Sequence, residues 1–295
     1  MMKYQYPRFT PHAIEIAARL GLRRSRPGEW RGTCPACGYA SAAVLSEREG
    51  LPLLWCASCN DRASLAALLR APAGGSLPPQ PAAPRDAASD AERIVARIER
   101  AREIWGGASP IEPGTPAAKY LEIRRISHVA TSPALRWRSD CPHPAGGRRL
   151  ALIAAVSAPD GEFAGVQRVF LKPDGTKADV EPVKASIGAI SGGAVRLQDC
   201  SAELAIAEGV ESAAAAGLIL GMPAWAAVSA GNMANSLILP AEIRTVTIAA
   251  DHDAPGIRAA EDAAVRWRDE GRSVRIIRAT TFGKDAADVL AEAAL

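Results

Sequence analysis

Aromatic residues and long apolar runs are scarce in this chain. Only 5% of its 295 residues are Phe, Trp or Tyr, and no run of the roughly 18 apolar residues that a membrane-spanning helix needs is free of charge. The first residues show no apolar segment of the kind found in secretory signals. We therefore expect no membrane span, no signal peptide and a cytoplasmic location. The sequence also lacks the GxxxxGK[ST] phosphate loop, which excludes the nucleoside triphosphatases built on that loop.

The length and composition indicate about two domains with a substantial core. Apolar residues make up 48% of the chain, and the net charge is only +3. This charge is unevenly spread: residues 1–70 hold 10 Lys and Arg against 5 Asp and Glu, residues 91–200 hold 16 against 12, and residues 201–295 hold 8 against 13. The basic parts suit a polyanion and the acidic part suits metal ions, while excesses of this size also occur on ordinary solvated surfaces.

Four of the 6 Cys residues form a tight pattern. Cys34 and Cys37 make one CxxC pair, and Cys56 and Cys59 make a second pair after a spacing of 18 residues. Because structural disulfides are rare in the cytosol, we interpret the four thiolates as ligands of one zinc ion. With every position taken by the protein, the zinc is expected to be structural, within a zinc ribbon. The two isolated Cys residues are expected to be ordinary thiols.

Basic and aromatic residues accompany the cysteine segment. Trp30 and Trp55 lie near its two ends. Four Arg residues precede or enter it: Arg23, Arg24, Arg26 and Arg31. Arg side chains contact phosphates and aromatic rings stack on bases, so this composition is typical of a surface that binds single-stranded nucleic acid. The alternative is that both Trp residues belong to the core of a small domain.

A stretch rich in Pro, Gly and Ala separates the cysteine region from the rest of the chain. Residues 71–90 carry no pattern that would bury one face, which indicates a semi-flexible linker. We therefore expect a zinc-ribbon domain at 1–70, a linker at 71–90, a basic subdomain at 91–200 and a further domain at 201–295.

Hydrophobic periodicity predicts the elements of these domains. Helices are predicted over 11–22, 63–70, 90–105 and 116–124, and strands over 150–156 and 165–171. From residue 203 the two kinds alternate, with strands over 203–207, 224–228, 243–250 and 273–278 and helices over 210–220, 232–238, 255–270 and 285–293. Apolar strands that alternate with helices are typical of a parallel sheet covered on both faces. The predicted fold class is α/β, with an α+β basic subdomain packed on that sheet.

Acidic side chains follow three of the strands predicted after residue 203. Glu208 follows the first strand, Asp251 and Asp253 follow the third, and Asp285 and Asp288 come after the fourth. Open α/β sheets build their sites at this edge. Carboxylates gathered there repel one another unless cations neutralise them, so the sequence predicts a Mg²⁺ or Mn²⁺ site. Asp253 and Asp285 can alternatively act only as N-caps of the helices that follow them.

The acidic segments, in this order, resemble the Toprim domain, which bacterial-type primases, topoisomerases, OLD-type nucleases and recombination mediators share. The matching stretches are residues 205–211 (AIAEGVE), 248–256 (IAADHDAPG) and 283–290 (GKDAADVL). The resemblance implies that Glu208 acts as an acid/base or metal-orienting carboxylate and that Asp251 and Asp253 hold Mg²⁺ or Mn²⁺. It implies less directly that Asp285 and Asp288 add to the metal site.

The segment before these motifs is similar to the subdomain that precedes Toprim in bacterial-type primases. The similar stretches are residues 147–153 (GRRLALI), 165–171 (GVQRVFL), 172–177 (KPDGTK) and 182–188 (PVKASIG). The order of parts is closest to the short Toprim primases of phages and integrative elements. Such a protein joins nucleoside triphosphates into short primers on a single-stranded DNA template. Phosphates and template are then expected to contact a basic wall, with Lys184 as its foremost member: Arg148, Arg149, Arg168, Lys177 and Lys184.

Other functions stay open at this point. Recombination mediators also join a four-cysteine zinc motif to Toprim, and a Toprim nuclease would use the same carboxylates. The basic stretch and the linker favour a primase over a mediator. A type IA topoisomerase is disfavoured, because none of the 4 Tyr residues lies in a large separate domain. Since the phosphate loop is missing, we expect a separate helicase as partner. Glu211 is expected on a solvated face, and we give His252 no catalytic role.

Overall fold

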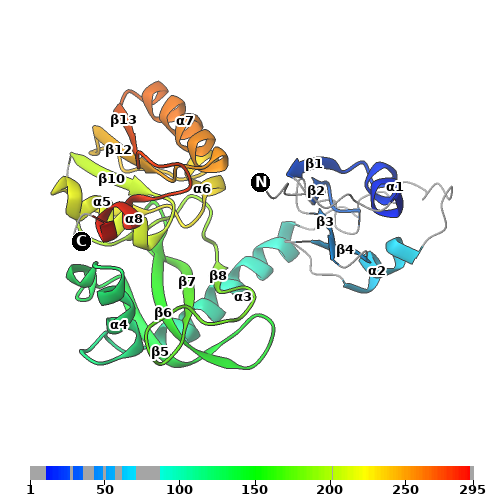
Figure 1. Cartoon of the computed structure of the whole chain (residues 1–295), viewed down its shortest axis with the longest axis horizontal. Coiled ribbons are helices and arrows are strands. Elements are labelled where there is room, and N and C mark those ends of the chain that lie inside the picture. Colours follow the sequence, from blue (N-terminus) through cyan, green and yellow to red (C-terminus); the bar gives the residue numbers. More distant parts are fainter. Residues whose placement is uncertain are drawn as a thin grey trace, which may run out of the picture. The chain divides into compact units, whose positions relative to one another are not determined.

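The chain forms two compact units, residues 1–90 and 91–295. The computed structural model describes residues 11–26, 29–35, 43–48, 51–56, 62–70, 87–200 and 202–292 (Figure 1). Among these residues, no helix combines the length and the apolar character that crossing a membrane requires.

The first unit is built on an antiparallel sheet with the order β1-β2-β3-β4. Its elements are α1 (Pro11–Arg19), β1 (Arg23–Arg26), β2 (Glu29–Gly32), β3 (Ala43–Arg48), β4 (Leu51–Cys56) and α2 (Arg62–Arg70). Ile16 of α1, Leu45 of β3 and Leu65 of α2 are buried in one small core. The two short helices were predicted within a few residues of these bounds.

The register of this sheet brings the two cysteine segments to one end. Ala43, the first residue of β3, pairs with Gly32 at the end of β2 and with Cys56 at the end of β4. Cys34 follows Gly32 by two residues and is fully buried. Cys37, Cys59 and the side chain of Cys56 lie outside the described residues, so the zinc site stays a prediction.

The two Trp residues of this unit differ in exposure. Trp30 is buried in the core, as the alternative interpretation has it, whereas the Trp55 side chain on the edge strand β4 is 47% exposed. Arg23 and Arg24 are exposed, and Arg31 forms an ion pair with Glu29. Trp55 therefore fits the predicted stacking surface and Trp30 does not.

The second unit contains two sheets. The antiparallel sheet has the order β5-β6-β7-β8, and the other has the order β13-β12-β10-β11-β9. Before and within the first sheet come α3 (Ala87–Gly106), α4 (Pro116–Ile123), the 3₁₀ turn η1 (Ser127–Val129), β5 (Leu135–Pro142), β6 (Arg148–Ser157), β7 (Phe163–Leu171) and β8 (Lys184–Gly188). The second sheet and its helices comprise β9 (Val195–Arg196), β10 (Glu203–Ala207), α5 (Val210–Leu220), β11 (Ala224–Ala226), α6 (Ala230–Asn235), β12 (Thr245–Ala250), α7 (Ala254–Asp269), β13 (Ser273–Arg278) and α8 (Ala286–Glu292).

Helices cover both faces of the second sheet, as predicted. Leu204, Ile206 and Ile248 point to the face that α6 and α7 cover, and Trp267 of α7 is fully buried there. The alternate strand residues point to α5 and α8, on the other side of the sheet in Figure 1. That second core extends without a break into the antiparallel sheet, where it includes Leu152.

Three strands of this unit were missed from the sequence. β5 carries four polar or charged residues among its eight, β8 has little apolar alternation, and β9 has only two residues. β9 runs antiparallel to β11, so the predicted parallel sheet has one antiparallel edge strand. Ala194, next to β9, forms a bridge with Ser157 at the end of β6 and so links the two sheets. α3 begins at Ala87, inside the stretch predicted as linker.

Close packing around α5 yields a stability prediction. A Cβ atom added at Gly217 would lie 2.9 Å from the Ala224 Cβ and 3.1 Å from the Met222 carbonyl oxygen, whereas one at Gly231 in α6 would meet no atom within 4 Å. We expect Gly217→Ala to lower the free energy of unfolding by about 1–3 kcal/mol. Gly231→Ala should leave it unchanged or raise it by up to about 1 kcal/mol. Chemical denaturation measures both, and equal effects would contradict the packing described.

Candidate functional site

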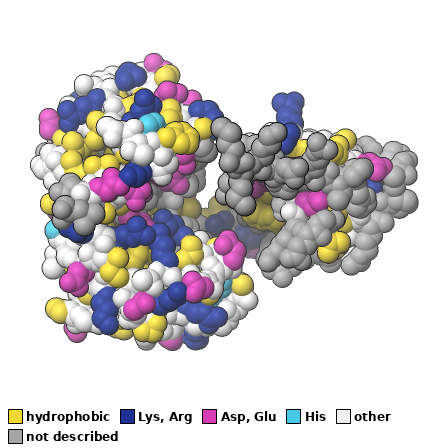
Figure 2. Space-filling model, in the orientation of Figure 1, with side chains coloured by type: hydrophobic (Ala, Val, Ile, Leu, Met, Phe, Trp, Pro, Cys, Tyr) yellow, Lys and Arg dark blue, Asp and Glu magenta, His cyan; other side chains and the backbone are white. Residues whose placement is uncertain are grey.

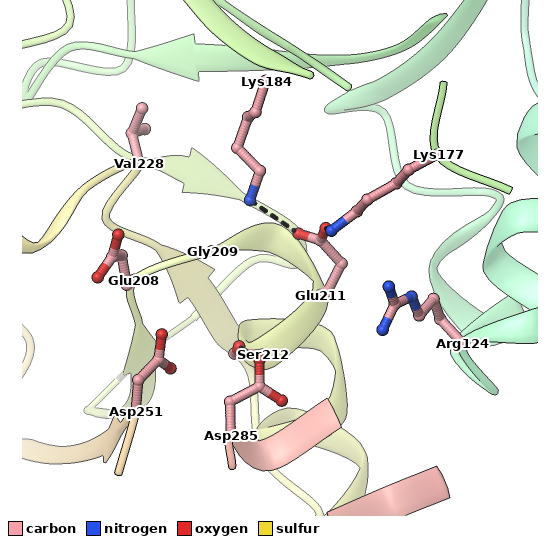
Figure 3. A pocket seen from close by; sticks show the side chains of 10 residues that line it. All are labelled: Arg124, Lys177, Lys184, Glu208, Gly209, Glu211, Ser212, Val228, Asp251 and Asp285. Atoms are coloured by element: carbon pink, nitrogen blue, oxygen red, sulfur yellow. Dashed lines mark hydrogen bonds and ion pairs between the residues drawn. The ribbon is translucent and has the colours of Figure 1, made fainter. Parts of the chain in front are cut away.

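A pocket of about 120 Å³ opens where β10 and β12 end, beside the β7–β8 connection. Glu208 follows β10, Asp251 follows β12, and Asp285 precedes α8. Its lining residues are Arg124, Lys177, Lys184, Glu208, Gly209, Glu211, Ser212, Val228, Asp251 and Asp285. In Figure 3 the carboxylates of Glu208, Asp251 and Asp285 lie along one side and the cations Lys177 and Arg124 across from them. Figure 2 shows acidic and basic side chains gathered next to each other on this face of the unit.

The acidic side of the pocket is under electrostatic strain. Burial raises the pKa of Asp251 to about 7, and the charges of Asp285, Glu208 and Asp253 add to that rise. Burial also raises the pKa of Glu208. Among the described residues, the buried Oδ1 atom of Asp251 has no hydrogen-bond partner. A bound cation would relieve this repulsion and satisfy this oxygen.

The remaining predicted carboxylates have capping roles. Asp253 is exposed and accepts a hydrogen bond of 2.7 Å from the Gly256 N–H at the start of α7. Asp285 accepts one of 2.9 Å from the Ser212 hydroxyl and another of 2.9 Å from the Asp288 N–H. Asp288 accepts in return from the Asp285 N–H at 3.2 Å. The capping interpretation thus holds for Asp253 and Asp285, and Asp253 and Asp288 do not line the pocket.

The geometry fits a divalent ion that takes few protein ligands. Within the described ranges, no three His, Cys, Asp or Glu side chains stand close enough to hold one ion among themselves. Mg²⁺ commonly binds through one or two carboxylates and completes its octahedron with waters and substrate phosphates. Glu208 and Asp251 can supply these oxygens, with Asp285 beside them.

Only two of the five predicted basic residues reach the pocket. Lys177 and Lys184 line it. Arg148 instead pairs with Asp140 at 2.8 Å, and the exposed Arg149 donates to the backbone carbonyl oxygen of Arg148. Arg168 is buried and donates to a backbone carbonyl near the end of β5.

The alternation of β7 explains the position of Arg168. Lys184 pairs with Val169, whose side chain belongs to the core shared with the second sheet. Neighbouring residues of a strand point to opposite faces, so Arg168 lies on the side of α3. Arg124 at the end of α4 lines the pocket instead. No spacing pattern marks Arg124, because it comes from a separate helix.

Glu211 was expected on a solvated face, and this expectation is wrong. Its side chain is only 8% exposed and lies 3.3 Å from the Lys177 ammonium and 3.5 Å from that of Lys184. The Tyr120 hydroxyl donates a hydrogen bond of 2.5 Å to it. Burial alone would raise the pKa of Glu211, but the two lysines and Tyr120 lower it to about 2. The sequence of α5, which is almost entirely Ala and other apolar residues, could have indicated this burial, because the helix has no polar face on which a Glu would be solvated.

A family model matches the segment that holds the acidic side of the pocket. Residues 203–294 match the family model of the Toprim domain. Residues 95–197, which precede it, match the model described as Domain of unknown function (DUF7146). None of the curated proteins matches the chain.

Several solved structures are similar to this chain at low identity. A DnaG primase catalytic domain bound to ssDNA is 16% identical, with coverage of 70% of this chain and 78% of that one and a TM-score of 0.48. The primase fragment of the bacteriophage T7 primase-helicase protein is 15% identical, with coverages of 90% and 95% and a TM-score of 0.43. The Aquifex aeolicus primase, in its zinc-binding and RNA polymerase domains, is 14% identical, with coverages of 96% and 83% and a TM-score of 0.39.

The raised pKa of Asp251 predicts how stability depends on pH. A carboxyl whose pKa rises from 3.8 to about 7 on folding stabilises the fold at low pH, and this contribution is lost as the pH rises toward 7. Asp251→Asn should therefore be more stable than the wild type at pH 7–8 without divalent ions, by about 1–2 kcal/mol after allowance for the partial exposure of the group. The advantage should shrink toward pH 4.

Thermal unfolding in EDTA across this pH range measures the difference. Asp262→Asn, at an exposed position of α7, is the matched control and should follow the wild type. Parallel pH profiles for the wild type and Asp251→Asn would contradict the strained acidic edge.

Proposed function

We propose that this chain is a DNA primase that synthesises short oligonucleotides on single-stranded DNA by metal-dependent nucleotidyl transfer. The observation that carries the proposal is a single pocket with an acidic side, for a divalent ion, and a basic side, for phosphates. The Toprim match supports the acidic side. The resemblance of residues 147–188 to the subdomain before Toprim in primases supports the basic side.

The acidic side would position the metal and handle the proton. Glu208 and Asp251 would hold Mg²⁺ or Mn²⁺, which supplies a clamp for the attacking and leaving oxygens of an in-line displacement. Glu208 would also be placed to accept a proton from an attacking 3′-hydroxyl. Asp285 would add negative charge beside them, and Asp253 and Asp288 would support the edge through their helix caps.

The basic side would bind the triphosphate. Lys177, Lys184 and Arg124 line the pocket and would offset charge that develops on the phosphates. Gly209, the N-cap of α5, has no side chain that competes for the first N–H groups of that helix, and it also lines the pocket. Helix N-termini favour phosphate oxygens. Arg148 and Arg149, which are exposed outside this pocket, would serve the template strand, and Arg168 would support β7.

The first unit would hold the template. Cys34, Cys37, Cys56 and Cys59 would bind one structural zinc ion and fix the end of the sheet where β2 and β4 meet β3. The exposed Trp55 ring and the exposed Arg23 and Arg24 are suited to stacking on bases and contacting phosphates. A separate helicase would supply the unwound strand.

A direct assay tests the proposed reaction. Full-length protein incubated with single-stranded DNA, labelled NTPs or dNTPs and Mg²⁺ or Mn²⁺ should make short oligonucleotides de novo. Asp251→Ala should lower the yield by roughly 100-fold or more, because a metal ligand is lost, and Asp262→Ala should not. Shortened DNA would indicate a nuclease, and DNA binding without synthesis in either metal would indicate a mediator.

The role of the first unit has a separate test. Cys34→Ser should release zinc, measured by elemental analysis, and abolish template-dependent initiation, while circular dichroism shows that the second unit keeps its fold. Cys200→Ser, at an isolated thiol of the second unit, is the matched control. Normal priming by zinc-depleted Cys34→Ser would show that the zinc module has another role.

A further inference from the structure

Glu211 is the most tightly held charged group of the pocket, and neither the acidic motifs nor the metal site accounts for it. It lies in the first turn of α5, with both of its oxygens engaged. Lys177 approaches Oε1 at 3.3 Å and Lys184 approaches Oε2 at 3.5 Å. Tyr120, which is buried in α4, donates to Oε1 and fixes the orientation of the carboxylate. The carboxylate is thus oriented by contacts on both oxygens, which a purely solvated charge would not have.

Lys184 lies between Glu211 and the acidic side. Figure 3 shows its ammonium group directed to Glu211, with Glu208 on the other side. A Cβ atom at Gly209 would lie 3.4 Å from Glu211 Oε2 and 3.5 Å from Lys184 Nζ, so this ion pair sits over the backbone that directly follows Glu208. Glu208 and Asp251 line the same pocket as Lys184. Lys184 is therefore close enough to act as counter-ion for either set of carboxylates.

A Lys ammonium on a flexible four-carbon stem goes to the carboxylate that holds it best. Without Glu211, the anionic partners left to Lys184 in the pocket would be Glu208, Asp251 and Asp285. An ammonium group bound there would occupy the oxygens that a divalent ion needs.

We propose that Glu211 is a positioning residue that keeps Lys184 on the phosphate side of the pocket, beside Lys177, and so leaves Glu208 and Asp251 open to a divalent cation. The inference rests on the proposed function only for the identity of the ligands, a divalent metal on one side and a nucleotide triphosphate on the other. Tyr120 takes part by holding the carboxylate from α4, which belongs to the segment before the Toprim domain.

Metal binding without nucleotide or DNA tests this role. Mn²⁺ binding to the full-length protein is measured by the paramagnetic signal of the free ion. Glu211→Gln, which keeps the shape and loses the charge, should weaken Mn²⁺ binding by roughly five- to tenfold. In a Lys184→Met background the same substitution should have no effect, because the competing ammonium is absent. Lys172→Met removes a surface cation that pairs with Asp179 and is the control background, in which the weakening should persist.

A second variant separates positioning from the plain loss of a charge. Glu211→Asp keeps the negative charge and withdraws it from Lys184 by one methylene. With Lys184 present, this variant should weaken Mn²⁺ binding by roughly two- to fivefold, and in the Lys184→Met background it should have no effect. If the Gln variant does not fold, the Asp variant provides the test. Equal weakening in both Lys184 backgrounds would overturn the inference, because Glu211 would then act on the metal directly. Unchanged Mn²⁺ binding in folded variants would overturn it as well.

The outcome is independent of primer synthesis. A protein that makes no primers but shows the predicted Mn²⁺ pattern would refute the proposed reaction and keep the role of Glu211. A protein that makes primers, but whose Mn²⁺ binding does not change when Glu211 is substituted, would support the proposed reaction and refute the role of Glu211.

Discussion

The burial of the first two turns of α5 on all sides is the constraint on which the site depends. From Val210 to Gly217 the helix is buried, and its side chains contact a core that includes strands of both sheets. Ala and Gly are the residues that allow backbones to approach this closely, which explains the run Ala213–Ala216. A helix in this position fixes the end of β10 on one side and α4 on the other. Glu208 precedes it, Glu211 lies in its first turn, and the cations around the pocket are arranged about these two carboxylates.

Two carboxylates three residues apart have opposite electrostatic surroundings. Glu208 shares its edge with Asp251, and burial raises the pKa of both. Glu211 meets two ammonium groups and a phenol, which hold its pKa at about 2. The carboxylates of Glu208 and Asp251 are thus available to a bound cation, whereas the carboxylate of Glu211 is already paired with Lys177 and Lys184. The pattern Glu-Gly-Val-Glu shows neither state, because the partners come from residues 120, 177 and 184.

The sequence allowed the elements of the C-terminal half to be predicted, because apolar strands and helices alternate there with clear periods. The bounds of β10, α5 and β13 agree with the prediction residue for residue. The position of Glu208, Asp251 and Asp285 at one sheet edge followed from the same pattern. The basic side could not be resolved in this way. The resemblance placed Lys184 first among the cations, but only the pairing of β8 with β7 shows that Lys184 faces the pocket and Arg168 does not. Arg124 and Tyr120 come from α4, which no motif marks.

The antiparallel strand β9 has a consequence for the way the second unit can be divided. It pairs with β11 but comes from the segment before the residues that match the Toprim model. Arg196 of β9 lies over the ring of Trp225, with its guanidinium carbon 4.5 Å from the ring centroid. A fragment that starts at residue 203 would leave β11 as a bare sheet edge with an uncovered indole beside it. Unpaired apolar edges of this kind recruit other chains. The two family models meet between residues 197 and 203. The structure indicates that the protein should not be cut there and that the two segments should be expressed together.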